Sequence, residues 1–147
     1  MDATQQMRLF LAVFALALCC VACSHNVNSK SASSSCDDAH LNAAANQGYA
    51  LLKSGDLYKA HLVGHELMTM GHACGDTEVA VSSTIQGEYI MAYVGFKLGD
   101  RVQSSRYTMM GMNALEIVKQ HTSEDPAYAE LYRQMQPRFL ALQVGLR

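Results

Sequence analysis

Three glycine–aspartate pairs divide the chain into segments of helical length, and they constrain the fold more than any other feature. The pairs are Gly55-Asp56, Gly75-Asp76 and Gly99-Asp100. Glycine is favoured just after a helix, where the backbone turns left-handed, and aspartate is favoured as the N-cap of the next helix. The sequence therefore predicts helices over residues 38–54, 57–73, 77–98 and 101–121.

A fifth helix is predicted to begin after Asp125-Pro126, because proline suits the first helical position. Pro137 is predicted to kink or end that helix, since proline has no amide hydrogen for the helical ladder. Connections this short force consecutive helices to lie antiparallel. Residues 37–147 are enough for one compact domain. The expected fold is all-α, with about five antiparallel helices.

Charge and motifs exclude two broad classes of function. Residues 23–147 contain twelve acidic and ten basic side chains, with no cluster of Lys or Arg. The electrostatic footprint of nucleic-acid binding is therefore absent. A Gly-x-Ser-x-Gly elbow, a phosphate loop and a paired-carboxylate arrangement are absent as well. We predict no nucleic-acid partner, no enzymatic activity and no cofactor.

The N-terminal segment has the features of a secretory signal. Residues 9–22 form an uncharged apolar run, shorter than the roughly 20 residues that span a bilayer as a helix. The run ends in Val21-Ala22-Cys23, which resembles the lipobox of bacterial lipoproteins. That resemblance implies acylation of Cys23, palmitate included, cleavage just before it, and anchoring in the membrane through the lipid. Cys20 stands where that family usually has Leu, so ordinary signal cleavage after Ala22 remains an alternative.

The lipobox also sets the expected domain boundaries and location. Residues 1–22 are expected to be a signal peptide, 23–36 a lipidated Ser-rich tether and 37–147 the helical domain. In the common enterobacterial sorting rule, Asp after the acylated cysteine retains the protein at the inner membrane, and this chain has Ser24. The resemblance implies a lipid-anchored protein on the periplasmic side of the outer membrane.

An internal repeat relates two of the predicted helix ends. Residues 48–56 and 92–100, 44 positions apart, match at Tyr, Lys, Gly and Asp. Small residues stand at Gly48 and Ala92 and again twelve positions later, at Ala60 and Ser104. In these positions the chain resembles the tetratricopeptide class of helical hairpins, whose own repeat is 34 residues long. A chance match between two helix turns is the other interpretation.

If the hairpins are real, the first helix of each lines one shared groove. Aromatic anchors flanked by cations suit a peptide groove with an acidic partner. The alternative is that the aromatic residues of the third helix form only its core face, and the fifth helix, through Tyr128 and Met135, is expected to cap the second hairpin. The predicted partner-binding residues are Tyr49, Lys53, Tyr89, Tyr93, Phe96 and Lys97.

The positions of two cysteines provide a test of the first predicted hairpin. Cys36 lies just before the first helix and Cys74 just after the second, so an antiparallel pair brings both to the same end. In an oxidising periplasm they are expected to form a disulfide, which would stabilise the fold by about 4 kcal/mol in the chain-entropy model. The alternative is a free thiol at Cys74, packed as a small apolar side chain.

The second helix contains the one pattern that could bind a metal. Its members share one side of the helix, and imidazole with thioether suits copper or zinc. The alternative is a polar flank of the helix, since no carboxylate or thiolate joins the set. Methionines 109, 110 and 112 also suggest copper, but Met109 and Met110 fit a buried stripe better. The candidate metal ligands are His61, His65, Met68 and His72.

Together these observations lead to one hypothesis and two alternatives. We expect a periplasm-facing outer-membrane lipoprotein that binds another envelope protein, as an adaptor or assembly factor for a secretion or pilus-type machine. A periplasmic copper- or zinc-binding protein is the first alternative. An immunity lipoprotein that neutralises a toxin is the second.

Overall fold

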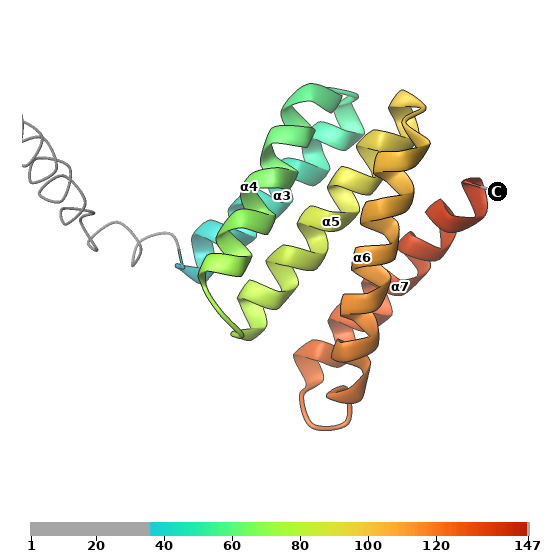
Figure 1. The fold of residues 1–147 in the computed structure, drawn as a ribbon. Coiled ribbons are helices and arrows are strands. Elements are labelled where there is room, and N and C mark those ends of the chain that lie inside the picture. Colours follow the sequence, from blue (N-terminus) through green and yellow to red (C-terminus); the bar gives the residue numbers. More distant parts are fainter. Residues whose placement is uncertain (1–35, 147) are drawn as a thin grey trace, which may run out of the picture. The chain divides into compact units, whose positions relative to one another are not determined.

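Five helices form the domain in the computed structural model, which describes residues 36–146 (Figure 1). The described residues contain no strand, so the all-α expectation is confirmed. The N-terminal signal, the lipobox and Cys23 lie outside the described residues. No helix within 36–146 is long and apolar enough to cross a bilayer. The helices are α3 (Asp38–Ser54), α4 (Leu57–Ala73), α5 (Glu78–Leu98), α6 (Arg101–Gln120) and α7 (Pro126–Gly145).

Two of the three predicted joints have the expected caps. Gly55 and Gly99 have φ of 81° and 75°, in the left-handed region that glycine adopts most readily. The side chain of Asp56 accepts a hydrogen bond from the amide of Lys59 at 3.2 Å. That of Asp100 does the same for Gln103 at 2.9 Å. Local backbone chemistry therefore sets where these helices end and begin.

The third joint differs from the prediction by one residue. Cys74 is the C-cap of α4, and Gly75 follows it with a φ of 76°. The N-cap of the next helix is Thr77, whose hydroxyl accepts from the amide of Ala80 at 3.3 Å, and not Asp76. Helix α5 consequently starts at Glu78 instead of residue 77.

Pro137 does not end the last helix, so that part of the prediction is wrong. Helix α7 runs through Pro137 to Gly145. The missing amide would have bonded the carbonyl of Arg133, and both residues are exposed. Water can therefore satisfy that carbonyl, which lowers the cost of a proline inside the helix.

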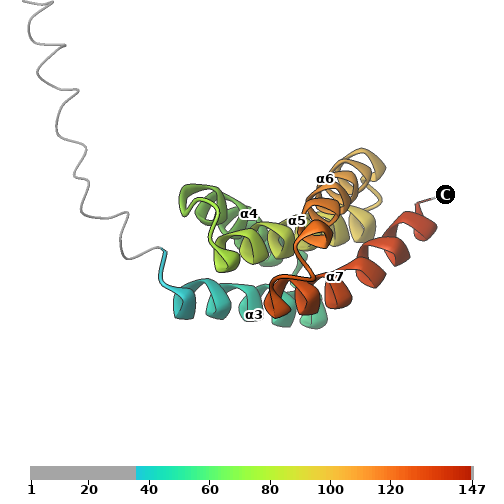
Figure 2. The same ribbon diagram turned by 90° about the horizontal axis from the view of Figure 1, so that it is seen from below.

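Helix α5 lies at the centre and packs against each of the other four helices. Figure 2 shows α3 and α7 on one side of α5, and α4 and α6 on the other. Consecutive helices are antiparallel, so α3, α5 and α7 run in the same direction. The two hairpins, α3–α4 and α5–α6, thus place their first helices next to each other, with α7 as a third member of that row.

Two clusters of buried residues hold the helices together on either side of α5. The first, here called the N-terminal cluster, joins α3, α4 and α5. The second, here called the C-terminal cluster, joins α5, α6 and α7. The N-terminal cluster consists of Ala45, Ala60, Val63, Leu67, Ile90 and Val94. The C-terminal cluster consists of Ile85, Ala92, Leu115, Val118, Leu131, Met135, Phe139 and Leu142.

Glycine allows α4 and α5 to approach closely. A Cβ atom at Gly87 would lie 2.7 Å from the carbonyl oxygen of Gly64 and 2.8 Å from Cγ of Met68. Any larger residue at 87 would push the helices apart. Met68, a candidate metal ligand, is therefore in contact with α5.

The predicted disulfide between Cys36 and Cys74 is present, with the two Cα atoms 5.5 Å apart. It joins the start of α3 to the end of α4, as the antiparallel hairpin requires. The free-thiol alternative for Cys74 is therefore wrong.

Candidate partner-binding groove

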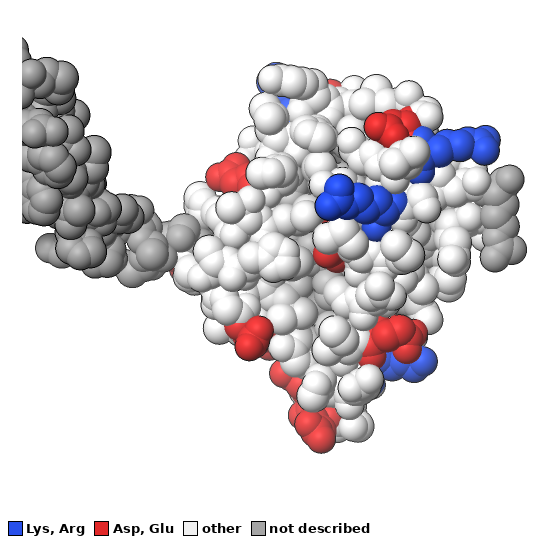
Figure 3. All heavy atoms as spheres, in the orientation of Figure 1, with Lys and Arg blue, Asp and Glu red and all other residues white. Residues whose placement is uncertain are grey.

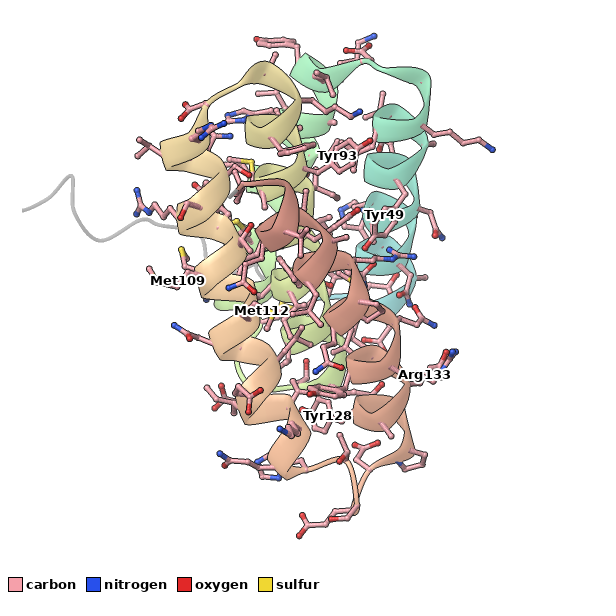
Figure 4. All side chains as sticks on the ribbon, turned by 90° about the vertical axis from the view of Figure 1, so that its right-hand side faces the viewer. Tyr49, Tyr93, Met109, Met112, Tyr128 and Arg133 are labelled. Atoms are coloured by element: carbon pink, nitrogen blue, oxygen red, sulfur yellow. A yellow bond between two sulfur atoms is a disulfide. The ribbon has the colours of Figure 1, made fainter. Side chains whose placement is uncertain are left out.

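Three of the predicted partner-binding residues form a continuous row of aromatic rings. The ring centroids of Tyr49, on α3, and Tyr89, on α5, are 6.1 Å apart. Those of Tyr89 and Tyr93 are also 6.1 Å apart. Figure 4 shows Tyr49 and Tyr93 between α3 and α7. Residues 40 positions apart in the sequence thus meet because the first helices of the two hairpins are neighbours.

Helix α7 contributes a cation that the sequence interpretation missed. The guanidinium carbon of Arg138 lies 4.8 Å from the ring centroid of Tyr49 and 5.7 Å from that of Tyr89. One N–H of Arg138 donates to the sulfur of Met135 at 4.0 Å, and the hydroxyl of Tyr49 donates to the same sulfur at 3.6 Å. Arg138 therefore connects α7 to both of the other helices in the row.

An open hollow of about 420 Å³ lies beside this cluster. Its wall is mostly apolar, with one guanidinium at the edge. Phe96 is 36% exposed there, while Tyr89 and Tyr93 are half-buried. The hollow is lined by Tyr89, Tyr93, Phe96, Pro137, Arg138, Ala141 and Leu142. We call this hollow, together with Tyr49 and the flanking lysines 53 and 97, the groove.

The aromatic residues on α5 belong partly to the core, and their partner-binding role stays a prediction. Tyr89 meets Phe139 of the C-terminal cluster edge-on, with 5.6 Å between ring centroids. Tyr93 also packs against that cluster. Each ring therefore has one side in the core and another toward the groove. The same side chains can stabilise the fold and contact a ligand.

The two predicted lysines occupy different positions relative to the rings. The ammonium of Lys97 lies 5.4 Å from the ring centroid of Tyr93, within cation–π range. Lys53 is exposed in the last turn of α3. Within residues 36–146 its side chain makes no hydrogen bond, ion pair or ring contact. Lys53 therefore belongs to the rim of the groove and not to the ring cluster.

Burial favours the neutral form of Tyr49 and Tyr89 in the groove. Burial raises the pKa of Tyr49 to about 12, although nearby Arg138 opposes this shift. The pKa of Tyr89 is raised for the same reason. Neutral phenol rings present a negative π face to Arg138 and Lys97. The cations and rings of the groove therefore attract each other without a carboxylate.

Within residues 36–146 the cations of the groove are not paired with carboxylates, and neither are Arg101 and Arg106 on α6. Each ion pair in residues 36–146 joins side chains three positions apart on one segment, as in Asp56–Lys59 at 2.9 Å and Glu116–Lys119 at 3.4 Å. In that part of the chain, no carboxylate lies within 4.0 Å of Lys53, Lys97 or Arg138. The groove cations are available to a ligand.

The histidine pattern on α4 does not converge. His65 and His72 are exposed, whereas His61 and Met68 are half-buried. His72 lines a separate hollow of about 290 Å³ between α4, α5 and α6. Across residues 36–146, no three His, Cys, Asp or Glu side chains are grouped to hold a metal ion.

The expected buried methionine stripe is only partly present. Met109 is 62% exposed, so its predicted burial is wrong. Met112 packs against the C-terminal cluster instead. Figure 4 shows Met109 directed away from the helices and Met112 directed toward α7. Met110, the other member of the predicted stripe, is half-buried.

A buried carboxyl group on α5 was also missed. Glu88 is only 4% exposed, and one of its oxygens has no hydrogen-bond partner in the described residues. Ser104 on α6 donates to the carbonyl of Ala92 at 2.9 Å, so the next turn of each helix brings Glu88 opposite Thr108. The hydroxyl of Thr108 is likewise buried without a partner there. Burial raises the pKa of Glu88 to about 7.

Comparisons of the chain with protein-family models, with curated proteins and with solved structures each found no match.

Proposed function

We propose that the protein is a lipid-anchored, periplasm-facing lipoprotein of the outer membrane whose helical domain binds another envelope protein. Its role is that of an adaptor or assembly factor for a secretion or pilus-type machine. The observation that supports this proposal best is the groove, in which three helices bring together aromatic rings and unpaired cations. Large rigid rings supply contact area at low entropic cost, and they are enriched where proteins bind one another.

The arrangement of the helices supports the same proposal. The row α3, α5, α7 resembles the first-helix row of tetratricopeptide hairpins, whose inner face binds extended or helical segments. The repeated Tyr and Lys positions, 49 with 93 and 53 with 97, both lie on this row. A binding role at the groove accounts for that repetition.

Affinity capture tests the binding role. A C-terminally tagged full chain is used to capture proteins from detergent-solubilised envelopes, beside a Tyr93→Ala, Lys97→Ala variant. The matched control is Tyr58→Ala, Lys59→Ala, because Tyr58 is 74% exposed at the start of α4 and outside the groove. We expect a partner with the parent and the control that is lost with the groove variant. Equal capture by all three chains would remove the groove from the proposal.

Labelling tests the anchor. Cells expressing the full chain are fed an alkyne analogue of palmitate, and the purified protein is examined for the label. We expect labelling of the parent and of Cys20→Ser, and none of Cys23→Ser. Labelling that survives Cys23→Ser would contradict the assignment of Cys23 as the acylated residue.

A further inference from the structure

We propose that the groove takes an acidic segment of the partner, with one carboxylate bound by Arg138 and an adjacent apolar side chain in the hollow. This inference rests on the proposed binding role of the groove. It adds the chemistry of the ligand and identifies Arg138 as the residue that selects it.

The position of Arg138 is the first argument. Lys53 and Lys97 lie in the last turns of α3 and α5, where a cation is favourable beside the negative end of the helix dipole. Arg138 lies two turns before the end of α7, which continues to Gly145. The helix dipole therefore does not explain the cation at this position.

The unused hydrogen-bonding capacity of Arg138 is the second argument. A guanidinium has five N–H donors in a planar fork, and within the described residues the side chain of Arg138 bonds only the sulfur of Met135 and Tyr49, so most of its donors stay free. The guanidinium lies close to the rings of Tyr49 and Tyr89, and the side chain of Arg138 is exposed to solvent. A planar fork with free donors is the arrangement that binds carboxylate in a bidentate manner.

The distribution of charge along the row of helices is the third argument. The starts of α3, α5 and α7 carry acidic residues, whereas the last turns of α3 and α5 carry lysines, and Figure 3 shows red gathered at the lower end. An acidic segment is therefore attracted to one end of the groove and repelled from the other. The acidic end has Asp37, Asp38, Asp76, Glu78, Glu124 and Asp125, and the opposite end of the row has Lys53 and Lys97, followed in the chain by the N-cap residues Asp56 and Asp100.

The hollow next to Arg138 indicates that the ligand also needs an apolar side chain beside its carboxylate. Its wall includes Phe96, Ala141 and Leu142 and holds no carboxylate. An apolar side chain of the ligand would bury surface there while its neighbouring carboxylate reaches the guanidinium. The expected ligand thus contains Asp or Glu next to a large aliphatic or aromatic residue.

Selection from a random peptide library displayed on phage tests the inference. The full chain in detergent is the bait, and the most enriched peptide is made with a fluorescent label for binding measurements. We expect Asp or Glu beside an apolar residue in the enriched peptides, and a dissociation constant about tenfold or more higher for Arg138→Gln, as the loss of a bidentate charged contact implies. Arg133→Gln is the matched control, because Arg133 is exposed on the same helix and paired with Glu130. It should bind as the parent does.

A double-mutant cycle between the peptide and Arg138 needs a second peptide, in which the carboxylates are changed to amides. This peptide should bind weakly to the parent and show no further loss with Arg138→Gln, because the two changes remove the same contact. Arg138→Lys should give intermediate binding, since charge remains but the fork is lost. Thermal unfolding of each variant confirms that it is folded.

The outcomes separate this inference from the proposed function. Peptides that lose binding with Tyr93→Ala but need neither their carboxylates nor Arg138 would overturn the acidic ligand and leave the groove in place. Peptides indifferent to Tyr93→Ala, or no enrichment at all, would overturn the binding role of the groove and this inference with it.

Discussion

The two clusters on either side of α5 are stabilised in different ways. The N-terminal cluster is built from small and medium side chains, two of its six members being alanine, and the Cys36–Cys74 disulfide closes the hairpin around it. The C-terminal cluster has no covalent link in the described residues, but it contains Phe139, Met135 and three leucines. Burial of large apolar side chains thus stabilises the C-terminal cluster, whereas the disulfide contributes to the stability of the N-terminal one.

The largest effect is expected from removing the main side chain of the C-terminal cluster. Phe139 is 0% exposed, and it contacts Gly111 and the edge of Tyr89. Phe139→Ala should lower the free energy of unfolding by about 5 kcal/mol, because the cavity adds to the lost burial. Urea unfolding followed by circular dichroism measures this change. The neighbouring Leu140, 41% exposed, provides the control, and Leu140→Ala should cost about 0.5 kcal/mol or less. If Phe139→Ala lowered the free energy of unfolding as little as Leu140→Ala does, large apolar side chains would not be what stabilises the C-terminal cluster.

Removing the disulfide should weaken the other region by a little less. The Cys36→Ser, Cys74→Ser variant should lose up to about 4 kcal/mol of unfolding free energy, and reduced parent protein should match it. Hydrogen exchange should rise first in α3 and α4, because their cluster is the smaller of the two. Exchange that rises equally across all five helices would mean that the bond stabilises the domain as a whole.

Glu88 should make stability depend on pH. Burial raises its pKa in the folded state to about 7, above the ordinary value of 4.5, so the folded protein binds the proton more tightly than the unfolded chain. Its contribution is full below pH 4.5 and is lost as pH rises toward 7, amounting to up to about 3 kcal/mol. Denaturant unfolding at several pH values should show this decline for the parent and a flatter profile for Glu88→Gln. Glu78→Gln is the control, because Glu78 is exposed in the first turn of the same helix. A parent profile as flat as that of Glu88→Gln would mean that the carboxyl ionises without cost.

Much of the fold could be predicted because the signals for it are local. Gly55, Gly99, Asp56 and Asp100 act within one helical turn of their own positions, so the sequence identifies the helix ends directly. The disulfide followed from the antiparallel hairpin, which short joints impose. The cap of α5 was predicted one residue too early because Asp76 and Thr77 are adjacent and both suit an N-cap. Their spacing from the helix does not show which of them is used.

Of the groove residues, those inside the internal repeat were the easiest to predict from the sequence. Tyr49 and Tyr93 were found because they match across the two hairpins. Arg138 has no counterpart in the repeat, and its place over two tyrosines depends on how α7 packs, which involves residues far apart in the chain. Glu88 did leave a signal, as a single charge within an apolar stretch of α5.

The smallest effect concerns the contact where the two regions meet. Tyr49 belongs to α3 of the N-terminal hairpin and Arg138 to α7, so their 4.8 Å contact joins elements that otherwise touch little. A double-mutant cycle with Tyr49→Leu and Arg138→Met should give a coupling energy of about 1 kcal/mol, from the cation–π contact and its partial burial. Arg106 and Tyr107, adjacent on α6 with 5.8 Å between guanidinium carbon and ring centroid, form the matched pair, and their coupling should be about half as large or less because this distance is longer than the 4.8 Å between Arg138 and Tyr49. Equal coupling in both pairs would show that the groove contact contributes no more than an ordinary surface contact. The two regions would then be joined through α5 alone, and Arg138 would be free of any structural role that competes with ligand binding.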